Sequence, residues 1–476
     1  MTESTVLKSF LEIPYDQLEE MNLKAKERRM SEDPEKLKAE YREYLKNETK
    51  IKAVTLCFSN IEGRLHMLDY DKKFLLDSAD NLTFDGSSIR GFTALKESDL
   101  RLEIDWPSIT WLPSDVFGPG KVMIFANVLN RDKTPYQSDF RGMLKQYLSE
   151  LREKQNIMAF SAPELVGFLV DGINAEQTFD EKKGFALTTM GGYFHSLPLD
   201  KLRKFIDATA EAQRAMGFRN EKDHPEVAPS QFEINFSYSE ALNACDQIQM
   251  YKLVCRQIAN NMNMTATFLP KPIAGINGNG MHTNFSLAKA GKNTFYDPKG
   301  TEGLSKTAWN FIDRLLNHAS EICLVLSSSV NAYRRLDPHF EAPNQIKVSP
   351  NDRGSMIRIP TGNEKTARIE IRSVAPDANP YLLLYTILRT GFEGTPIDEK
   401  KKKKVRILPS TIYEAMEVFE KSKFVAAILG KDNKEKYLEF KKAAAERSPK
   451  ELGTLVKTSE VIYHHEVFNQ VLWNNF

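Results

Sequence analysis

Apolar and polar residues alternate at every second position in five short segments of the chain. In QFEINF (231–236), two phenylalanines and an isoleucine alternate with Gln231, Glu233 and Asn235. The same alternation recurs in SAPELVGFLV (161–170), GMHTNFSL (280–287), MIRIP (356–360) and ARIEIR (367–372). Because successive side chains of a strand point to opposite faces, the pattern predicts five strands, each with one apolar and one polar face. The polar faces carry Glu, Arg, His and Asn rather than the Lys, Thr and Ser usual on solvent-facing strands.

The first 130 residues predict a helical segment followed by a small sheet. Residues 1–48 are rich in Lys, Glu and Arg, and Leu37, Tyr41 and Leu45 are spaced as on an amphipathic helix, which forms either a solvated arm or a packing helix. Short strands separated by Gly, Asn and Asp are expected at 51–58, 63–70, 81–88 and 121–130, with an irregular strand and turn at 106–120.

The remainder of the chain alternates helical runs with short strands. Helices are expected over 143–154, capped by Ser138 or Asp139, and near 199–216, 240–264, 304–327, 378–392, 410–420 and 433–446. The sequence therefore predicts an α+β protein with a helical N-terminal arm (1–48), a small sheet-rich domain (49–136) and a larger domain (137–476).

Composition narrows the class of protein. The 476 residues include 65 Lys and Arg and 64 Asp and Glu, a formal net charge of +1, which does not favour a nucleic-acid or membrane-surface partner. No apolar stretch approaches the ~20 residues of a membrane helix, and the first residues lack the features of a signal peptide. The four cysteines have no CxxC spacing. We expect a cytoplasmic globular protein of two or three domains, at about 150 residues per domain.

The polar strand faces predict a metal site. If the five strands adjoin in one sheet, four carboxylates and one imidazole converge, namely Glu164, Glu226, Glu233, His282 and Glu370. These carboxylates cannot stay ionised together without strong cationic compensation. Mg²⁺ or Mn²⁺, which favour oxygen ligands, would supply it.

Several arginines lie in or near the same segments, at positions 335, 353, 358, 368 and 372. The guanidinium group binds phosphates and carboxylates in bidentate fashion. A divalent metal with an arginine cluster is typical of phosphoryl transfer from a nucleotide. No GxxxxGK[ST] or GxGxxG motif occurs, so a P-loop, Rossmann or kinase frame is not supported.

Eight segments, in order, resemble the glutamine synthetase family in its class I, bacterial-type form. They are FDGSSIRGF followed by KESD (84–99), PEL (163–165), GGYF (191–194), HPEVAPSQFEINF (224–236), KPIAGINGNGMHTNFSL (271–287), NAYRRLDPHFEAP (331–343), NDRGSMIRIP (351–360) and ARIEIRSVAPDANPYL (367–382). The resemblance implies an N-terminal β-grasp domain and a C-terminal domain whose curved antiparallel sheet holds the active site. It also implies a homo-oligomer of two stacked rings, commonly a dodecamer, with active sites shared between neighbouring subunits.

The resemblance further implies ATP-dependent ligation of ammonia to the γ-carboxylate of L-glutamate through γ-glutamyl phosphate. Glu226 and Glu233 resemble ligands of one metal ion, and Glu164, His282 and Glu370 resemble ligands of the second. The positions that resemble glutamate-binding residues are Asn277, Gly278, His282, Arg335 and Arg372. Those that resemble ATP-binding residues are Tyr238 and Ser286 near the adenine, and Lys365 and Arg368 near the phosphates.

Five residues resemble groups that act in the reaction itself. Arg353 and Arg358 match arginines that stabilise the transferring phosphoryl group. Asp85, from the adjacent subunit, and Glu341 resemble the groups that bind and deprotonate ammonium, and Tyr193 resembles a lining residue of that pocket. A loop carrying Glu341 must exclude water, because the acyl phosphate would otherwise hydrolyse.

The sequence departs from the family pattern at the first metal strand. The family has Glu-x-Glu there, whereas Glu164 is followed two positions later by Val166, which offers no oxygen and no charge. We expect a weakened metal site and a weaker hold on the substrate's amino group. The segment after Gly394 lacks the adenylylation motif of one branch, and Ala94 stands where another branch has a feedback arginine. The histidines at 224, 339, 464 and 465 are expected to be surface or packing residues.

Two alternative functions stay open at this point. The first is a γ-glutamyl-polyamine or related amide ligase, with Val166 marking an altered specificity, although Asp85 and the FDGSS–KESD spacing favour ammonium. The second is a catalytically weak, ring-forming protein that binds a nucleotide or a partner. Val166 favours this reading, and the intact arginines and remaining ligands argue against it.

Overall fold

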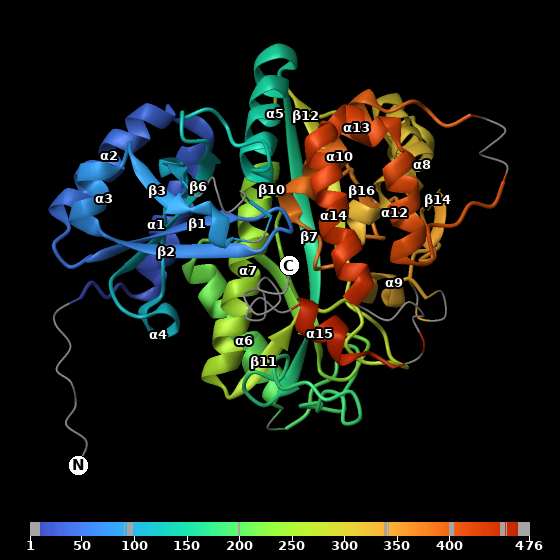
Figure 1. Cartoon of the computed structure of the whole chain (residues 1–476), viewed down its shortest axis with the longest axis horizontal. Helices are drawn as coiled ribbons and strands as arrows, with labels where there is room; N and C mark the ends of the chain where they lie inside the picture. Colours follow the sequence, from blue (N-terminus) through green and yellow to red (C-terminus); the bar gives the residue numbers. More distant parts are fainter. Residues whose placement is uncertain are drawn as a thin grey trace.

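The computed structural model describes residues 10–89, 91–92, 99–198, 200–337, 340, 342–398, 404–447, 453 and 455–464. It contains two sheets, one in each domain, and the small domain lies beside α5 and α7 of the large one (Figure 1). The predictions made for Glu341, for Ala94 and for the histidines at positions 339 and 465 fall outside the described residues.

The small domain is a mixed sheet of six strands. The strands are β1 (Ala53–Ser59), β2 (Leu65–Asp71), β3 (Leu82–Asp85), β4 (Asp99–Ile104), β5 (Thr110–Trp111) and β6 (Lys121–Leu129). Their order is β2-β1-β6-β4-β3, with β5 on β6, and β1 and β6 run parallel while the other pairs are antiparallel. The predicted β-grasp domain is confirmed, but β4 and the helix α3 (Lys72–Ser78) were not predicted.

The two central strands of this sheet are buried on both faces. On β1, Val54 and Leu56 face the core of the small domain, whereas Cys57 joins the core of the large domain. On β6, Ile124 faces the core of the small domain and Phe125 joins the core of the large domain. Alternate residues thus supply two different cores, which explains why both strands are nearly continuous apolar runs.

The N-terminal arm is packed against both domains. It forms α1 (Tyr15–Ser31) and α2 (Pro34–Asn47), and the predicted apolar stripe of α2 is buried. The helix α1 lies within the arm predicted to be helical, but the sequence did not give its bounds. The buried side chain of Asn22 donates to the carbonyls of Trp111 and Ala215, at 2.9 and 2.8 Å, so that α1 joins the small sheet to the large domain. Of the two readings of the arm, the packing helix is therefore correct.

The large domain has a ten-stranded sheet in the order β14-β15-β16-β12-β7-β9-β8. These strands are β7 (Ile157–Asp171), β8 (Asn220–Pro225), β9 (Gln231–Phe236), β12 (Met281–Lys289), β14 (Gln345–Ser349), β15 (Ser355–Arg358) and β16 (Ile369–Ile371). The short strands β10 (Ser239–Glu240), β11 (Met264–Thr267) and β13 (Lys292–Asn293) pair at its margins. The five strands predicted from alternation are consecutive neighbours, β15-β16-β12-β7-β9, which confirms the expectation that they adjoin.

Helices cover the apolar faces of these strands. Those predicted are α5 (Phe140–Gln155), α6 (Lys201–Ala215), α7 (Ala241–Asn261), α8 (Lys306–Leu326), α10 (Pro380–Glu393), α12 (Ile412–Lys421) and α14 (Lys431–Arg447). The short helices α4 (Ser114–Phe117), α9 (Val330–Arg335), α13 (Lys423–Leu429) and α15 (Thr458–His464) were not predicted. Asp139 caps α5 by accepting from the backbone N–H of Arg141. The aromatic and aliphatic side chains of β9, β12 and β16 join helical residues in one core, which leaves their polar faces on the opposite side.

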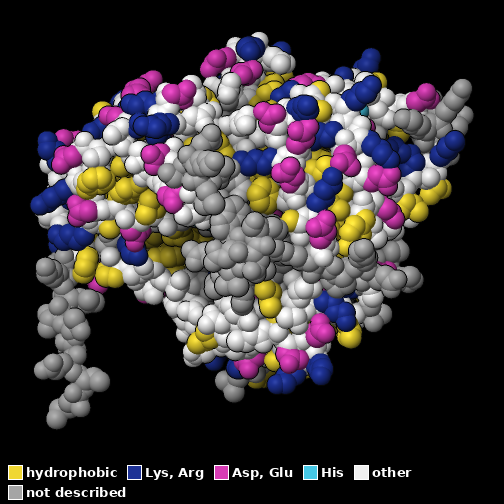
Figure 2. Space-filling model, in the orientation of Figure 1, with side chains coloured by type: hydrophobic (Ala, Val, Ile, Leu, Met, Phe, Trp, Pro, Cys, Tyr) yellow, Lys and Arg dark blue, Asp and Glu magenta, His cyan; other side chains and the backbone are white. Residues whose placement is uncertain are grey.

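The surface and the cysteines agree with the composition. Over the face drawn in Figure 2, Lys and Arg side chains are interspersed with Asp and Glu. The four cysteines are free and buried. Within the described ranges, no helix has the length and apolar character needed to cross a membrane.

Candidate active site

The polar strand faces of the large sheet line a cavity of about 550 Å³. The predicted residues that line it are Glu164, Tyr193, Glu226, Glu233, Asn277, Gly278, His282, Arg335, Arg353, Arg358, Glu370 and Arg372. Strand register explains this convergence. His282 on β12 lies opposite Glu164 on β7, and Arg358 on β15 lies opposite Glu370 on β16. Directly opposed residues share a face of the sheet, so their side chains meet.

Two groups of three side chains in this cavity could each hold a metal ion. One group is Glu164, His282 and Glu370, and the other is His224, Glu226 and Glu233. Within each group the potential ligand atoms all lie within 4.8 Å of one another. The predicted convergence of the five ligands is therefore observed as two adjacent clusters.

The carboxylates of the first cluster have cationic or hydrogen-bonding partners. Glu370 is fully buried, accepts from Arg372 Nη1 at 2.6 Å and also pairs with Arg358. Burial alone would raise the pKa of Glu164, but His282 and the Asn284 amide lower it to about 2. Burial lowers the pKa of His282 below its usual value, which the nearby carboxylates only partly offset, so the imidazole is neutral near pH 7.

The carboxylates of the second cluster accept hydrogen bonds but form no ion pair with a lysine or arginine among the described residues. Burial and then the carboxylates of Glu164 and Glu226 raise the pKa of Glu233 to about 8. Asn235 Nδ2 donates to Glu233 Oε1 at 2.8 Å, and among the described residues no arginine or lysine forms an ion pair with this carboxylate. A divalent cation would relieve this repulsion. Carboxylate oxygens with neutral imidazoles are a donor set that fits Mn²⁺, and the oxygens fit Mg²⁺.

Two buried arginines have side-chain donors without a hydrogen-bond partner in the part of the chain that the structure describes. Arg335 on α9 donates through Nη2 to the carbonyl of Arg372 at 2.8 Å. Burial, together with the nearby Arg372 guanidinium, lowers the pKa of Arg335 to about 9. Among the described residues, Arg335 Nη1 and Arg372 Nε have no hydrogen-bond partner. Buried guanidinium donors of this kind fit a carboxylate ligand.

A glycine allows the neighbouring loop to approach these arginines. A Cβ at Gly278 would lie 2.5 Å from the carbonyl oxygen of Pro270 and 3.2 Å from Arg335 Cγ. The first of these contacts is with backbone, which cannot move aside cheaply. Only glycine therefore lets the segment that carries Asn277 pass so close to Arg335.

A second cavity, of about 440 Å³, adjoins the first and shares Glu164 and Lys222 with it. The residues predicted to hold the nucleotide line it, namely Tyr238, Ser286, Lys365 and Arg368. Arg368 Nε donates to Asn284 Oδ1 at 2.9 Å, and Asn284 Nδ2 donates to Glu164 at 3.0 Å, so one amide links the two cavities. The exposed ring of Tyr238 packs edge-on against Phe160.

Asp85 does not join these cavities in its own chain. It lies at the end of β3 in the small domain, where it is exposed. Its Oδ1 accepts from the backbone N–H and the hydroxyl of Ser87, at 2.9 and 2.6 Å, and its Oδ2 accepts from the Ser88 hydroxyl at 2.6 Å. The loop therefore presents this carboxylate on the surface in a fixed orientation.

Three site residues were missed in the sequence. His224, expected to be a surface or packing histidine, is buried and packs against Phe194, and its ring also lies among the potential ligand atoms of the second cluster. Its spacing of two residues from Glu226 is the signal that could have found it, because such residues share a strand face. Lys222 lines both cavities, and Asn284 contacts Glu164 and Arg368.

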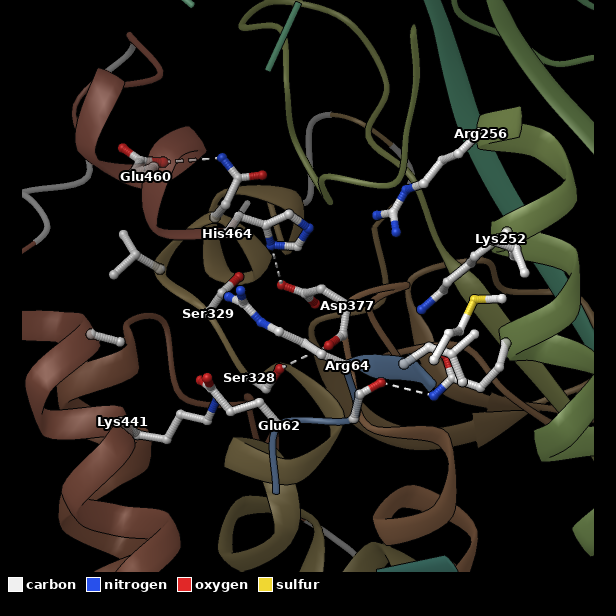
Figure 3. Close-up of a pocket in the computed structure, with 18 residues that line it drawn as sticks. Glu62, Arg64, Lys252, Arg256, Ser328, Ser329, Asp377, Lys441, Glu460 and His464 are labelled. Atoms are coloured by element: carbon white, nitrogen blue, oxygen red, sulfur yellow. Dashed lines mark hydrogen bonds and ion pairs between the residues drawn. The ribbon is translucent and has the colours of Figure 1, made fainter. Parts of the chain in front are cut away.

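A third cavity lies where the small domain meets the C-terminal helices (Figure 3). It measures about 210 Å³ and lies between the β1–β2 turn, α7, α14 and α15. Lys441 Nζ is 3.2 Å from Glu62 Oε1, and His464 Nδ1 is 3.7 Å from Asp377 Oδ2. No predicted site residue lines this cavity. The Lys441–Glu62 pair joins the two domains, so the cavity is part of the domain contact.

Two family models match the chain. Residues 50–131 match the β-grasp domain of glutamine synthetase, and residues 137–455 match its catalytic domain. The glutamine synthetase of Thermus thermophilus is 38% identical over 418 residues, which cover 83% of this chain and 92% of the relative. That of Staphylococcus aureus is 36% identical over 415 residues, which cover 80% and 89%.

Solved structures agree with the fold. A cryo-EM structure of Plasmodium falciparum glutamine synthetase superimposes with a TM-score of 0.77 at 22% identity, over 86% of this chain and 95% of that one. A complex of GmaS with ADP superimposes with a TM-score of 0.74 at 25% identity, over 90% and 99%. With both domain models matched in order, and with relatives above one-third identity over most of their length, the chain belongs to the glutamine synthetase family.

Proposed function

We propose that the protein ligates ammonia to the γ-carboxylate of L-glutamate with ATP as the energy source. The reaction passes through γ-glutamyl phosphate and gives glutamine, ADP and phosphate. One observation carries this proposal: a cavity with clustered carboxylates and unused arginine donors adjoins a second cavity lined by the predicted nucleotide residues, and the two meet at Glu164. This arrangement brings a carboxylate substrate and a triphosphate together.

The substrates divide between the two cavities. Arg335 and Arg372 would bind the α-carboxylate of glutamate through their unused donors, with Asn277, Gly278 and His282 beside it. Tyr238 and Ser286 would contact the adenine, and Lys365 and Arg368 the phosphates. The γ-phosphate then lies near Glu164, which lines both cavities.

The carboxylate clusters would hold two divalent cations, Mg²⁺ or Mn²⁺. One cation would bind at Glu226 and Glu233, and the second at Glu164, His282 and Glu370. When bound, such cations neutralise phosphate charge and polarise the phosphoryl oxygens. The fit of a cation to this cluster rests on Glu233, whose pKa is raised by burial and by the neighbouring carboxylates.

Transfer and amination use further side chains. Arg353 and Arg358 would stabilise the charge on the γ-phosphoryl group as its bond to ADP breaks and its bond to the glutamate γ-carboxylate forms. Asp85 of a neighbouring subunit and Glu341 would bind ammonium beside Tyr193 and take up its proton. Ammonia then attacks the acyl phosphate and phosphate leaves.

The proposal includes the assembly. Because Asp85 is exposed and lies away from the cavities of its own chain, completing the ammonium site requires a neighbouring subunit. We propose a ring-forming homo-oligomer, a dodecamer of two stacked hexamers, with domain limits at residues 48 and 136. The cytoplasmic location expected from the sequence stays a prediction.

Product analysis with different amines tests the reaction. The purified protein is incubated with glutamate, ATP and Mg²⁺ or Mn²⁺, with either ammonium or putrescine as the acceptor, and amide and ADP are quantified. Amide formed with ammonium supports the proposal. ATP binding without amide from either acceptor would contradict it and select a nucleotide-binding protein of weak activity.

A second candidate is a ligase for larger amines, which the apolar side chain of Val166 in the cavity lining favours. Amide formed only with putrescine would select it.

Mixing inactive subunits tests the shared site. Asp85→Ala and Arg353→Ala chains, each inactive alone, are unfolded together and reassembled. If sites are shared, random pairing regenerates about a quarter of the intact sites, because each needs one good residue from each chain. Activity that stays at the level of the separate variants would contradict a shared site.

A further inference from the structure

We propose that His224 is the third protein ligand of the cation held by Glu226 and Glu233. Val166, on the other side of Glu233, offers no ligand atom, and the imidazole supplies the third one. The inference rests on the proposed function, since it concerns a cation of that same site. It also changes the metal preference expected of the site.

Strand register places the two positions symmetrically about Glu233. On β9, Glu233 lies opposite His224 of β8 on one side and opposite Val166 of β7 on the other. Opposed residues share a face of the sheet, so both side chains point into the same cavity, which both line. Of the two residues opposite Glu233, Val166 on β7 has no donor atom, whereas His224 on β8 has one.

The histidine is oriented as a ligand. Its Nδ1 lies 3.1 Å from the carbonyl oxygen of Pro225, and a carbonyl can only accept, so Nδ1 carries the proton. Nε2 then presents a lone pair, 3.7 Å from Glu233 Oε1. That separation is too long for a hydrogen bond. It lies within the roughly 3–4.2 Å that separate two ligands of one cation at about 2.1 Å each. Metal-bound histidines commonly donate their other N–H to a backbone carbonyl in this way.

Surrounding side chains fix the ring. His224 is 6% exposed and packs edge-to-face against Phe194, with ring centroids 4.8 Å apart, and against Tyr193. The loop that carries both aromatics is tied to the β8–β9 turn by Ser230, whose hydroxyl accepts from the backbone N–H groups of Thr188 and Thr189 at 2.8 and 3.0 Å. The imidazole therefore has little freedom to turn away from Glu233.

A ligand set that includes an imidazole has a chemical consequence. Mg²⁺ is a hard cation that favours oxygen ligands, whereas imidazole suits later first-row metals better. The Glu226–Glu233 site should accordingly prefer Mn²⁺ to Mg²⁺ by a wider margin than the Glu164–Glu370 site. A carboxylate introduced at position 166 should lower the ratio of Mn²⁺ affinity to Mg²⁺ affinity at this site.

Metal titration of matched variants tests the inference on the full-length protein. Mn²⁺ binding is followed by electron paramagnetic resonance of free Mn²⁺ in the parent, His224→Phe, Val166→Glu and His224→Phe/Val166→Glu. Phenylalanine keeps the aromatic packing and removes both nitrogens. We expect His224→Phe to weaken one of two Mn²⁺ sites by about tenfold or more and to leave the other unchanged. The double variant should regain most of that loss.

Competition with Mg²⁺ gives a second readout that does not depend on removing the histidine. Val166→Glu alone should increase Mg²⁺ affinity at the affected site and lower the ratio of Mn²⁺ to Mg²⁺ affinity. Crystals soaked in Mn²⁺ should show an anomalous peak about 2.2 Å from His224 Nε2. A peak at Glu226 and Glu233 with His224 beyond hydrogen-bond distance would overturn the inference.

The same titrations separate this inference from the proposed function. Two Mn²⁺ sites that are both unaffected in His224→Phe would overturn only the role of His224. A parent protein that binds no Mn²⁺ at either cluster would overturn the proposed function as well. Tighter Mn²⁺ binding in His224→Phe would identify His224 as a positive counter-charge to Glu233 and would also overturn the inference.

Discussion

Two regions of the molecule bury arginines together with carboxylates, and they differ in how fully the charges are paired. At the contact between the domains, the guanidinium of Arg141 donates to Asp105 at 2.6 Å, to Asp246 at 2.9 Å and to Asn127 at 2.7 Å. Burial opposes ionisation of Asp105, but Arg141 and the neighbouring cations hold its pKa below the usual range. Tyr381 completes the network by donating to Asp246 at 2.8 Å.

The cavity of the large sheet is built from the same residue types but is left incomplete. Burial, reinforced by the facing carboxylates, raises the pKa of Glu233, and burial, reinforced by a second arginine, lowers the pKa of Arg335. Around these two residues like charges are grouped, although Glu370 in the same cavity pairs with Arg358 and Arg372. A buried charge network that satisfies itself holds the fold together, whereas one that segregates its signs requires ligands of opposite charge.

Breaking the paired network should have the largest effect. In Arg141→Met, Asp105 and Asp246 stay buried and lose their central partner, so we expect a loss of about 3–5 kcal/mol in unfolding free energy. The thermal midpoint and the yield of soluble protein report it. Arg203→Met is the matched control, because its ion pairs with Asp207 and Asp223 are partly exposed and should contribute less than about 1 kcal/mol. Equal losses in the two variants would contradict the comparison.

Removing an arginine from the cavity should affect catalysis instead of stability. Arg353 is exposed at the cavity lining. We expect Arg353→Ala to lower kcat/KM by about 10²–10³, or ~3–4 kcal/mol, because it would stabilise charge that develops in the transition state. Arg219→Ala, at an exposed ion pair with Glu27 outside the cavity, should leave kcat/KM unchanged. A lowered thermal midpoint with normal kcat/KM in Arg353→Ala would show that this residue stabilises the fold and does not act in catalysis.

The sequence predicted the cavity better than the contact that joins the domains. Alternation identified the strands that carry Glu164, Glu233 and Glu370. In a strand with one buried face, apolar residues recur at every second position. It could not give the order of the strands. The strand of Glu370 lies between those of Arg358 and His282, although it follows His282 by more than 80 residues in the chain.

The missed elements share a physical cause, since their positions depend on distant partners. The helix α1 has little amphipathic pattern and is held in part by the side chains of Asn22 and Arg29, which contact residues far along the chain. The role of His224 depends on its register with Glu233, which the sequence of one strand does not contain. The neighbour that Asp85 would serve is a second copy of the chain, so no pattern within one copy specifies that contact.

Divalent metal should stabilise the cavity and not the domain contact. At a Mn²⁺ concentration 100 times the dissociation constant, binding to the folded state adds about 2.7 kcal/mol to its stability. The shift in thermal midpoint between Mn²⁺ and a chelator measures it. Arg141→Met should show the same shift as the parent, because its network contains no metal site, whereas Glu233→Gln should show a smaller one. A shift unchanged by Glu233→Gln would mean that the cation binds elsewhere.

The effect of a single pH unit is the smallest, about 1 kcal/mol, and it should appear in the metal-free protein between pH 5 and pH 8. Glu233 has a pKa of about 8 in the folded state, against an ordinary value of 4.5. Between these values the folded chain keeps a proton that the unfolded chain has released, so stability falls as the pH rises. Glu233→Gln cannot release a proton there and should flatten the fall in the thermal midpoint.

Asp105 provides the contrast, because its lowered pKa means that its contribution to stability is present above about pH 4 and is lost only on acidification. Saturating Mn²⁺ should also flatten the slope of the parent, since it favours the ionised carboxylates. A slope that persists in Glu233→Gln would assign the titration to another group and would remove the distinction between a network that is complete and one that requires a cation.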